Sequence, residues 1–239
     1  MFSHTELRAR LERDVDAFAS HPLFATLEWG CAEQEDYDTF VRRVALTHLK
    51  APQVLAFVWA ISPPSIAPGI RRRMLEESGL EPDGLDSPAR LERLLRAVGL
   101  GREVRELHLQ AQQDLQQAIT RPLRCRTLRD IGLAVLMDVA AFDYLLAALA
   151  ARCVKFLRQH RGVPEDALGW FAQHREMGRG RAEESLDQVA AYMAHYDIAE
   201  AEAQPVVDAV LQGNVFLQRY FGPVAVPAAA SLGTACLSA

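Results

Sequence analysis

Several ionisable side chains lie at helical spacing in the segment WFAQHREMGRGRAEESL, residues 170–186. His174, Gly178 and Arg181 occupy positions i, i+4 and i+7, so they share one face of a helix. This spacing would hold three metal ligands together if all were His, Asp or Glu, but a single histidine does not hold a metal. The spacing alone therefore favours a satisfied core histidine beside an exposed arginine. Gly178 and Gly180 leave open whether the helix is broken here.

Three carboxylates and a second histidine are further candidates for chemistry. Asp138 stands in the apolar run GLAVLMDVAAF, where an ionised carboxylate must be paired or metal-bound, or else be protonated. It is either a satisfied core acid or a functional group that lines a pocket. Glu76 and Glu77 end a predicted helix, where the helix dipole disfavours negative charge, so they are solvated or serve as ligands or ion-pair partners. His48 is either a satisfied histidine or a catalytic one.

The charge balance limits the classes of partner. The chain carries 26 basic and 31 acidic side chains, a net charge of −5, which argues against a nucleic-acid partner. We interpret the short basic clusters at residues 71–73 and 121–129 as solvated helix faces rather than as a phosphate groove. The N-terminal sequence MFSHTELRARLERD lacks the apolar core of a signal peptide, and no C-x-x-C motif occurs. We therefore expect a cytoplasmic protein with reduced thiols.

The elements that must position these residues are helices. Apolar residues recur at helical spacing along most of the chain, and long alternating strand patterns are absent from the sequence. We predict a single all-α bundle of seven to eight helices over residues 1–222, followed by a small apolar tail over residues 223–239. A long second helix is expected from about residue 33 to the prolines at 63–64, and a last helix from about 198 to 221.

One predicted helix is apolar enough to resemble a membrane span. It covers residues 131–151 and contains Asp138 and Asp143. A charge near the centre of a bilayer costs about 2.5–3.5 kcal/mol on insertion scales. We therefore interpret this segment as a buried helix at the centre of the bundle, and we expect no membrane partner.

Three segments together resemble the heme-oxygenase-like superfamily, in particular its branch of TenA, PqqC and haem-oxygenase-like diiron oxidases. HPLFATLEWGCAEQEDYDTFVRRV, residues 21–44, resembles the early segment of that branch. MLEESGLEPDGLDSPARLERLLRAVGL, residues 74–100, resembles its third-helix signature, and residues 170–186 resemble its sixth-helix signature. The resemblance spans about residues 20–220. It implies a heme-oxygenase-like helical bundle that forms a homodimer and binds a small organic molecule in its core.

In diiron members of this branch, the resemblance implies two irons held by Glu, His and Asp from three helices. The six positions fall here on three residues that match and three that do not: Glu77 (with Glu76 the close alternative), Asp138 and His174, then Ser87, Gly178 and Arg181. A guanidinium at position 181 repels a cation and can itself neutralise an acid, so we predict an ion pair between Arg181 and Glu77 or Asp138. We expect no metal, or at most one weakly bound iron.

The resemblance implies a small-molecule oxidoreductase with a degenerate metal site, performing an oxidative step in specialised or cofactor metabolism. His174 is then the acid–base candidate, with Asp138 and Glu77 as its charge partners. The expected substrate-binding residues are Arg181, which would hold an anionic group, and Tyr144, His48 and Gly178. The alternative is a non-catalytic descendant that binds a ligand or a partner protein. An open cavity lined by these residues would favour the enzyme, and a filled core would favour the alternative.

Overall fold

The computed structural model describes residues 4–80, 86–120 and 127–222, and these residues form helices without strands. The expected tail, residues 223–239, lies outside the described residues. The α-helices are α1 (His4–Ala19), α2 (Pro22–Glu28), α3 (Gln34–His48), α4 (Ala51–Ile61), α5 (Ala67–Glu77), α6 (Ser87–Ala97), α7 (Val104–Thr120), α8 (Leu128–His160), α9 (Gly169–His195), α10 (Glu200–Val210) and α11 (Val215–Phe221). Two 3-10 helices, η1 (Gly101–Glu103) and η2 (Glu165–Leu168), precede α7 and α9. The prediction of an all-α chain is confirmed.

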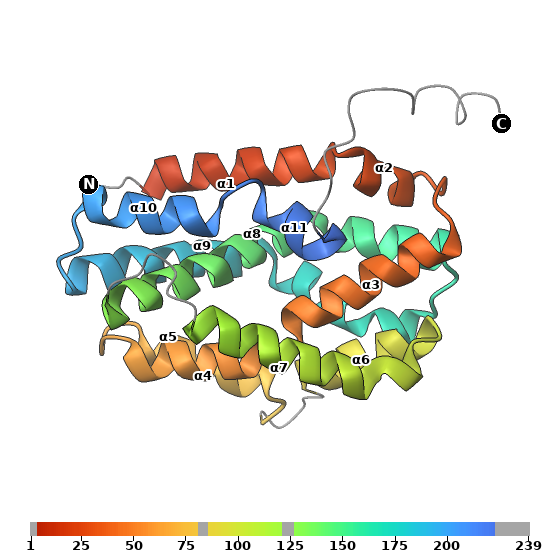
Figure 1. Cartoon of the computed structure of the whole chain (residues 1–239), viewed down its shortest axis with the longest axis horizontal. Coiled ribbons are helices and arrows are strands. Elements are labelled where there is room, and N and C mark those ends of the chain that lie inside the picture. Colours follow the sequence, from red (N-terminus) through yellow and green to blue (C-terminus); the bar gives the residue numbers. More distant parts are fainter. Residues whose placement is uncertain (1–3, 81–85, 121–126, 223–239) are drawn as a thin grey trace.

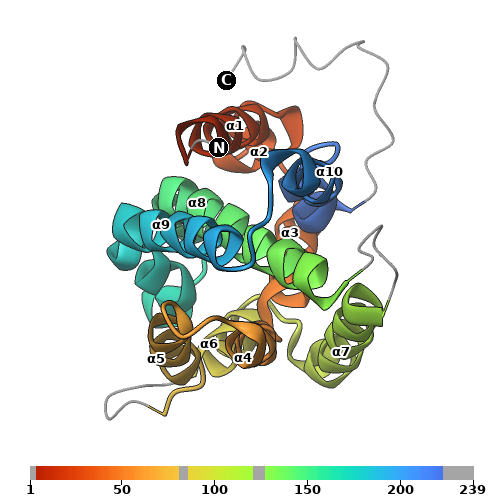
Figure 2. The same ribbon diagram turned by 90° about the vertical axis from the view of Figure 1, so that its left-hand side faces the viewer.

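The helices are arranged around a central pair, α8 and α9, which lie side by side (Figures 1 and 2). On one side of this pair lie α1, α2, α10 and α11, and on the opposite side lie α4, α5, α6 and α7. Helix α3 joins the two sides, because it contacts α11 as well as α6 and α7. The central pair therefore contacts helices on both sides of the bundle.

Helix α8 extends beyond the predicted residues 131–151 at both ends. The side chain of Thr127 accepts a hydrogen bond from the backbone N–H of Asp130 and so caps the helix. By length and composition alone, Gln34–Ile61 and Leu128–His160 are both apolar enough to cross a membrane; 28% of the tested window is buried in the first and 67% in the second. The buried residues of α8 pack against helices on both sides of it, so its predicted position at the bundle centre is confirmed.

The described residues form eleven α-helices rather than seven to eight, and two of the predicted helices are each divided in two. The predicted second helix divides before Pro52, which occupies the first turn of α4. Proline is tolerated there because a first-turn N–H has no partner within the helix. The predicted last helix divides at Gly213 and Asn214, whose φ angles of 62° and 55° are left-handed. The side chain of Asn214 then caps α11.

The expectation of reduced cysteines is only partly correct. Cys153 on α8 is a buried free thiol, and burial raises its pKa far above the usual value, so it remains protonated. Cys31 is disulfide-bonded, which contradicts the expectation at that position. Cys125 and Cys236 lie outside the described residues.

Candidate functional site

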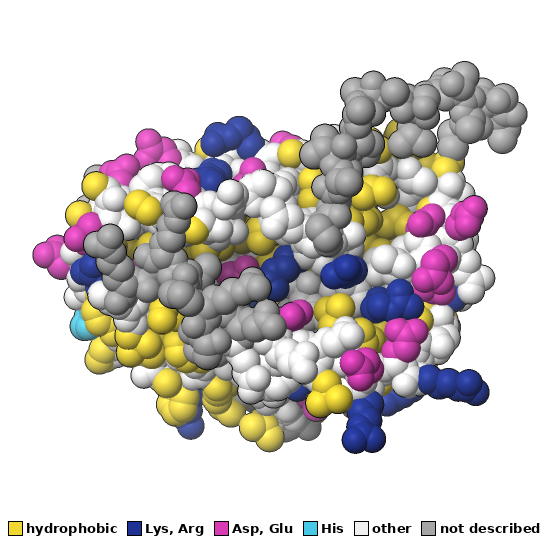
Figure 3. Space-filling view, viewed as in Figure 1, with side chains coloured by type: hydrophobic (Ala, Val, Ile, Leu, Met, Phe, Trp, Pro, Cys, Tyr) yellow, Lys and Arg dark blue, Asp and Glu magenta, His cyan; other side chains and the backbone are white. Residues whose placement is uncertain are grey.

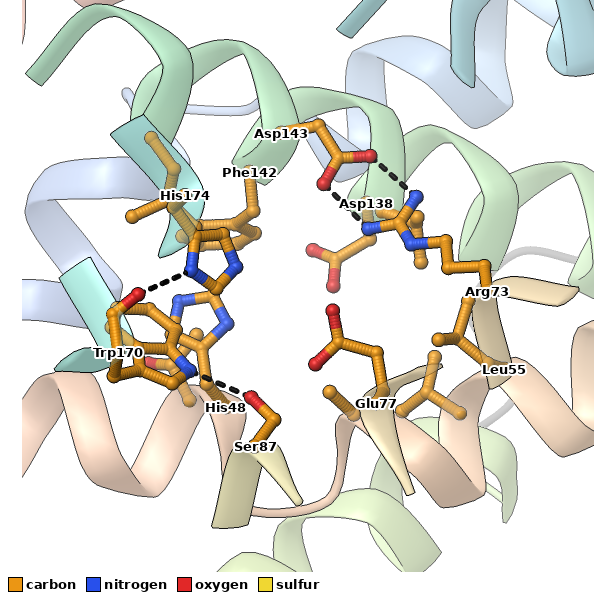
Figure 4. A pocket seen from close by; sticks show the side chains of 15 residues that line it. His48, Leu55, Arg73, Glu77, Ser87, Asp138, Phe142, Asp143, Trp170 and His174 are labelled. Atoms are coloured by element: carbon orange, nitrogen blue, oxygen red, sulfur yellow. Dashed lines mark hydrogen bonds and ion pairs between the residues drawn. The ribbon is translucent and has the colours of Figure 1, made fainter. Parts of the chain in front are cut away.

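A cavity of about 60 Å³, called the polar cavity after the ionisable side chains among its lining residues, lies in the core, with walls from α3, α4, α5, α6, α8 and α9 (Figure 4). It has room for a few water molecules. Four of the seven predicted site residues line it, each from a different helix: His48, Glu77, Asp138 and His174. Residues distant in the sequence therefore meet at one place, as the sequence hypothesis requires.

His174 is held in a defined tautomer. Its Nδ1 lies 2.9 Å from the backbone oxygen of Trp170, one turn earlier on α9. A carbonyl oxygen only accepts hydrogen bonds, so Nδ1 carries the proton and Nε2 holds the lone pair of the neutral ring. Burial lowers the pKa of His174, and the negative charge of Glu77 partly opposes that shift. His174 is therefore an uncharged base near neutral pH.

His48 is more enclosed and has a hydroxyl partner. Its Nε2 lies 2.8 Å from the hydroxyl of Tyr220 on α11, and its ring packs against Phe142 and Trp170. Burial lowers the pKa of His48 well below its usual value, and the nearby positive charges lower it further. Tyr220 was not predicted, and its pKa is raised by burial, so it remains a phenol. The hydrogen bond between His48 and Tyr220 fixes the orientation of the His48 ring at the wall of the cavity.

Two carboxylates face these imidazoles across the cavity (Figure 4). The side chain of Glu77 is only 4% exposed, and its Oε1 accepts a hydrogen bond of 3.1 Å from Nη1 of Arg181. The predicted ion pair between Arg181 and Glu77 is thus confirmed, and Arg181 also pairs with Glu76. Glu77 therefore lies beside a fixed positive charge, because a guanidinium does not lose its proton in proteins.

Asp138 has a different partner. Its Oδ1 lies 3.8 Å from Nη2 of Arg219 on α11, so the predicted alternative of a pair with Arg181 is wrong. Its side chain is 33% exposed and lines both this cavity and a larger one beside it. Burial raises the pKa of Asp138, and Arg219 only partly opposes this shift. Asp138 therefore takes up a proton more readily than a free aspartic acid does.

The sequence interpretation missed a buried ion pair at the same cavity. Arg73 on α5 donates from both terminal nitrogens to the carboxylate of Asp143 (Figure 4). This carboxylate also accepts a hydrogen bond from the hydroxyl of Ser185. The side chain of Arg73 is only 12% exposed, so the interpretation of residues 71–73 as a solvated face is wrong at this position. The signal was present, because Arg73 lies four residues before Glu77 and thus on the same face of α5.

Three predicted substrate-binding residues do not line the cavity: Arg181, Tyr144 and Gly178. Arg181 lies behind Glu77, where its two acid partners occupy the guanidinium. The hydroxyl of Tyr144 lies 3.5 Å from Glu183 instead. We therefore correct the prediction that these residues contact a substrate in this cavity.

A break in α9 explains why His174 and Arg181 do not share one helix face as predicted. Gly178 has φ 47° and ψ −145°, which is not helical, so α9 is kinked between His174 and Arg181. A Cβ added at Gly178 would meet nothing within 4 Å, so neither helix packing nor the course of the arginine side chain requires glycine here. The positive φ does require it, because residues with a Cβ rarely adopt this conformation.

The donor set does not fit the metal centre that the resemblance implies. Within the described part of the chain, no three His, Cys, Asp or Glu side chains are placed to bind a metal ion together, and this includes Glu77, Asp138 and His174. The hydroxyl of Ser87, at a position where the branch has a histidine, accepts a hydrogen bond of 2.8 Å from the indole of Trp170. Arg181 places a fixed positive charge beside Glu77. These side chains therefore do not match the metal-binding residues of that branch.

A second, larger cavity of about 530 Å³ adjoins the polar one. The two share Thr47, Val54 and Asp138 as lining residues, so Asp138 stands at the boundary between them. The larger cavity is bordered by α3, α4, α7, α8, α10 and α11. Its volume is in the range of small-molecule sites, which are commonly about 300–1,000 Å³.

No family model matches this chain, and no curated protein matches it.

Proposed function

We propose that this chain is a small-molecule enzyme with a heme-oxygenase-like bundle, in which His174 transfers protons to and from an organic substrate. The observation that carries the proposal is the polar cavity, where a buried neutral imidazole and a carboxylate of raised pKa line one space. Perturbed pKa values of this kind, paired in a cleft, are typical of catalytic acids and bases.

The roles follow from the geometry. Nε2 of His174 holds the lone pair, so it is the atom that accepts a proton from the substrate. Glu77 stabilises the imidazolium that forms, because its negative charge raises the pKa of His174. Asp138 is the complementary acid, since burial favours its protonated form. The pairs of Arg73 with Asp143 and of His48 with Tyr220 hold the walls in place.

The resemblance of the sequence adds the class of reaction and of assembly. It supports an oxidative step in specialised or cofactor metabolism, and the side chains of this cavity would supply the proton transfers of such a step. The homodimer and the cytoplasmic location remain predictions. The alternative is a non-catalytic descendant that binds a ligand or a partner protein, and in that case no chemistry follows binding.

The test is untargeted metabolite profiling with and without added iron. Purified protein is incubated with a bacterial metabolite extract, and the compounds consumed are compared between wild type, His174→Gln and His195→Gln. His195 lies exposed on the same helix, so its variant is the matched control. We expect wild type and the control to consume the same compounds and His174→Gln to leave them intact.

Two results would reject the proposal. One is consumption by His174→Gln at the wild-type rate. The other is a compound that raises the melting temperature of the wild type but is never converted, which would favour the non-catalytic alternative. Circular dichroism of each variant establishes that the helical fold is retained.

A further inference from the structure

The larger cavity has a mostly apolar wall with positive charge at its edge. Hydrophobic side chains from α4, α7, α8, α10 and α11 form the wall: Val54, Phe57, Leu115, Val135, Val210 and Val215. Lys50 and Arg219 also line it. Figure 3 views the molecule from the side of α3, α7 and α11, and shows basic and acidic side chains beside hydrophobic ones near the middle of this face.

The two cations keep unused binding capacity. Lys50 forms no ion pair with any carboxylate in the described ranges. Arg219 is 40% exposed, and its contact with Asp138, at 3.8 Å, is longer than a hydrogen bond. Other arginines in the interior differ, because Arg73 and Arg161 each donate two hydrogen bonds to one carboxylate. Arg219 can therefore accept a further anionic partner.

The acids that line the larger cavity do not fully cancel this charge. Asp114 is the second acid among the lining residues, and it lies exposed on α7. Asp138 lies at the boundary with the polar cavity, and its charged form is disfavoured by burial. The lining thus combines a loosely held guanidinium, an ammonium group and an apolar wall.

We propose that the larger cavity binds an organic anion with an apolar body, whose carboxylate pairs with Arg219 and Lys50 while its body lies against the hydrophobic wall. This inference names the substrate class of the proposed enzyme and rests on the proposed function for the chemistry, although the binding itself does not. The head of such a ligand lies beside Asp138, at the entrance to the cavity that contains His174.

Binding of the anion has a consequence for Asp138. A carboxylate that pairs with Arg219 brings a second negative charge beside Asp138 and shares the positive charge of that guanidinium with it. The positive charge then opposes the effect of burial on Asp138 less strongly. The substrate therefore favours the protonated form of the acid that the proposed reaction needs.

Calorimetric titration of the full chain tests the proposal with three probes that share one apolar body: phenylbutyrate, phenylbutanol and phenylbutylamine. We expect the carboxylate to bind about tenfold tighter than the alcohol, or more, since a charge-assisted hydrogen bond contributes roughly 1.5–3 kcal/mol. Phenylbutylamine should bind most weakly. Added sodium chloride should weaken the binding of phenylbutyrate and leave that of phenylbutanol unchanged.

Variants locate the head group. Arg219→Gln should weaken phenylbutyrate binding about tenfold and leave phenylbutanol binding unchanged, and Lys50→Gln should act in the same direction with a smaller effect. Arg158→Gln, on an exposed position of α8, is the matched control and should bind as the wild type does. Equal affinity for the three probes, no binding of phenylbutyrate, or equal affinity in Arg219→Gln and Arg158→Gln would each overturn the inference.

The outcome is separable from the proposed function. His174→Gln retains Lys50, Arg219 and the apolar wall, so it should bind phenylbutyrate as the wild type does. Loss of turnover in His174→Gln without any preference for the carboxylate would leave the proposed function standing and reject this inference. If the protein prefers the carboxylate but converts no compound, this inference stands and the proposed function is rejected.

Discussion

Removing the positive charge of Arg181 should destabilise the bundle strongly. The substitution Arg181→Met keeps the aliphatic length and leaves Glu77, 4% exposed, without its ion-pair partner. Breaking a buried pair in this way costs about 3–5 kcal/mol, whereas the pair with the more exposed Glu76 contributes at most about 1 kcal/mol. Arg73 remains near Glu77 and offsets part of the loss. We therefore expect the free energy of unfolding to fall by about 3 kcal/mol.

Urea unfolding of four proteins measures this cost and its origin: wild type, Arg181→Met, Glu77→Gln and the double variant. The double variant contains no unpaired buried charge, so it should be more stable than Arg181→Met, with a coupling free energy of about 1–3 kcal/mol. Arg179→Met changes an exposed arginine of the same helix and should cost less than about 0.5 kcal/mol.

The same variants should change the titration of His174. Arg181 lowers the pKa of His174 and Glu77 raises it, so Arg181→Met should raise that pKa and Glu77→Gln should lower it. Histidine resonances followed by NMR across the pH range provide the measurement. A cost for Arg181→Met below about 1 kcal/mol, or shifts of the His174 pKa in the same direction in both variants, would refute the role given to this arginine.

The kink in α9 and the buried histidines give two further predictions. Gly178→Ala should lower the free energy of unfolding by about 1–3 kcal/mol because of its positive φ, whereas Gly180→Ala, at an exposed helical position, should raise it by about 0.5–1 kcal/mol. If urea unfolding shows that both substitutions change the free energy of unfolding in the same direction, the kink at Gly178 is contradicted. His48 and His174 have lowered pKa values, so the unfolded chain takes up protons first. Stability should be complete above about pH 6.5 and fall below it, by up to about 1.4 kcal/mol per pH unit for each histidine. If the free energy of unfolding of His48→Gln depends on pH below 6.5 as steeply as that of the wild type, this prediction is wrong.

The sequence predicts the helices well and their ends less well. The cap at Thr127 and the buried helix that follows it are recognisable because local chemistry and apolar spacing agree. The breaks before Pro52 and at Asn214 are not, because apolar residues continue on both sides of each break. The same ambiguity applies to Gly178, since a glycine within a helical pattern does not reveal its own φ.

The candidate site is predictable where one helix face determines it. His48, Glu77, Asp138 and His174 each lie on a helix, and they meet in one cavity. Arg73 was missed because a run of three arginines is typical of a surface, although consecutive helical residues differ by about 100° in direction and one of them faced the core. The role of Arg219 depends on how α11 packs, which local spacing does not encode.

The pairing of interior acids with arginine affects how protons move within this protein. Glu77, Asp143 and Asp38 each contact a guanidinium, a cation that does not lose its proton in proteins. His174 and Asp138, in contrast, shift toward each other, since burial lowers the pKa of the base and raises that of the acid. Their proton affinities are therefore closer than those of a free imidazole and a free carboxylic acid. Moving a proton between His174 and Asp138 therefore costs less free energy than moving one between the free groups, in an interior whose arginines supply fixed positive charge.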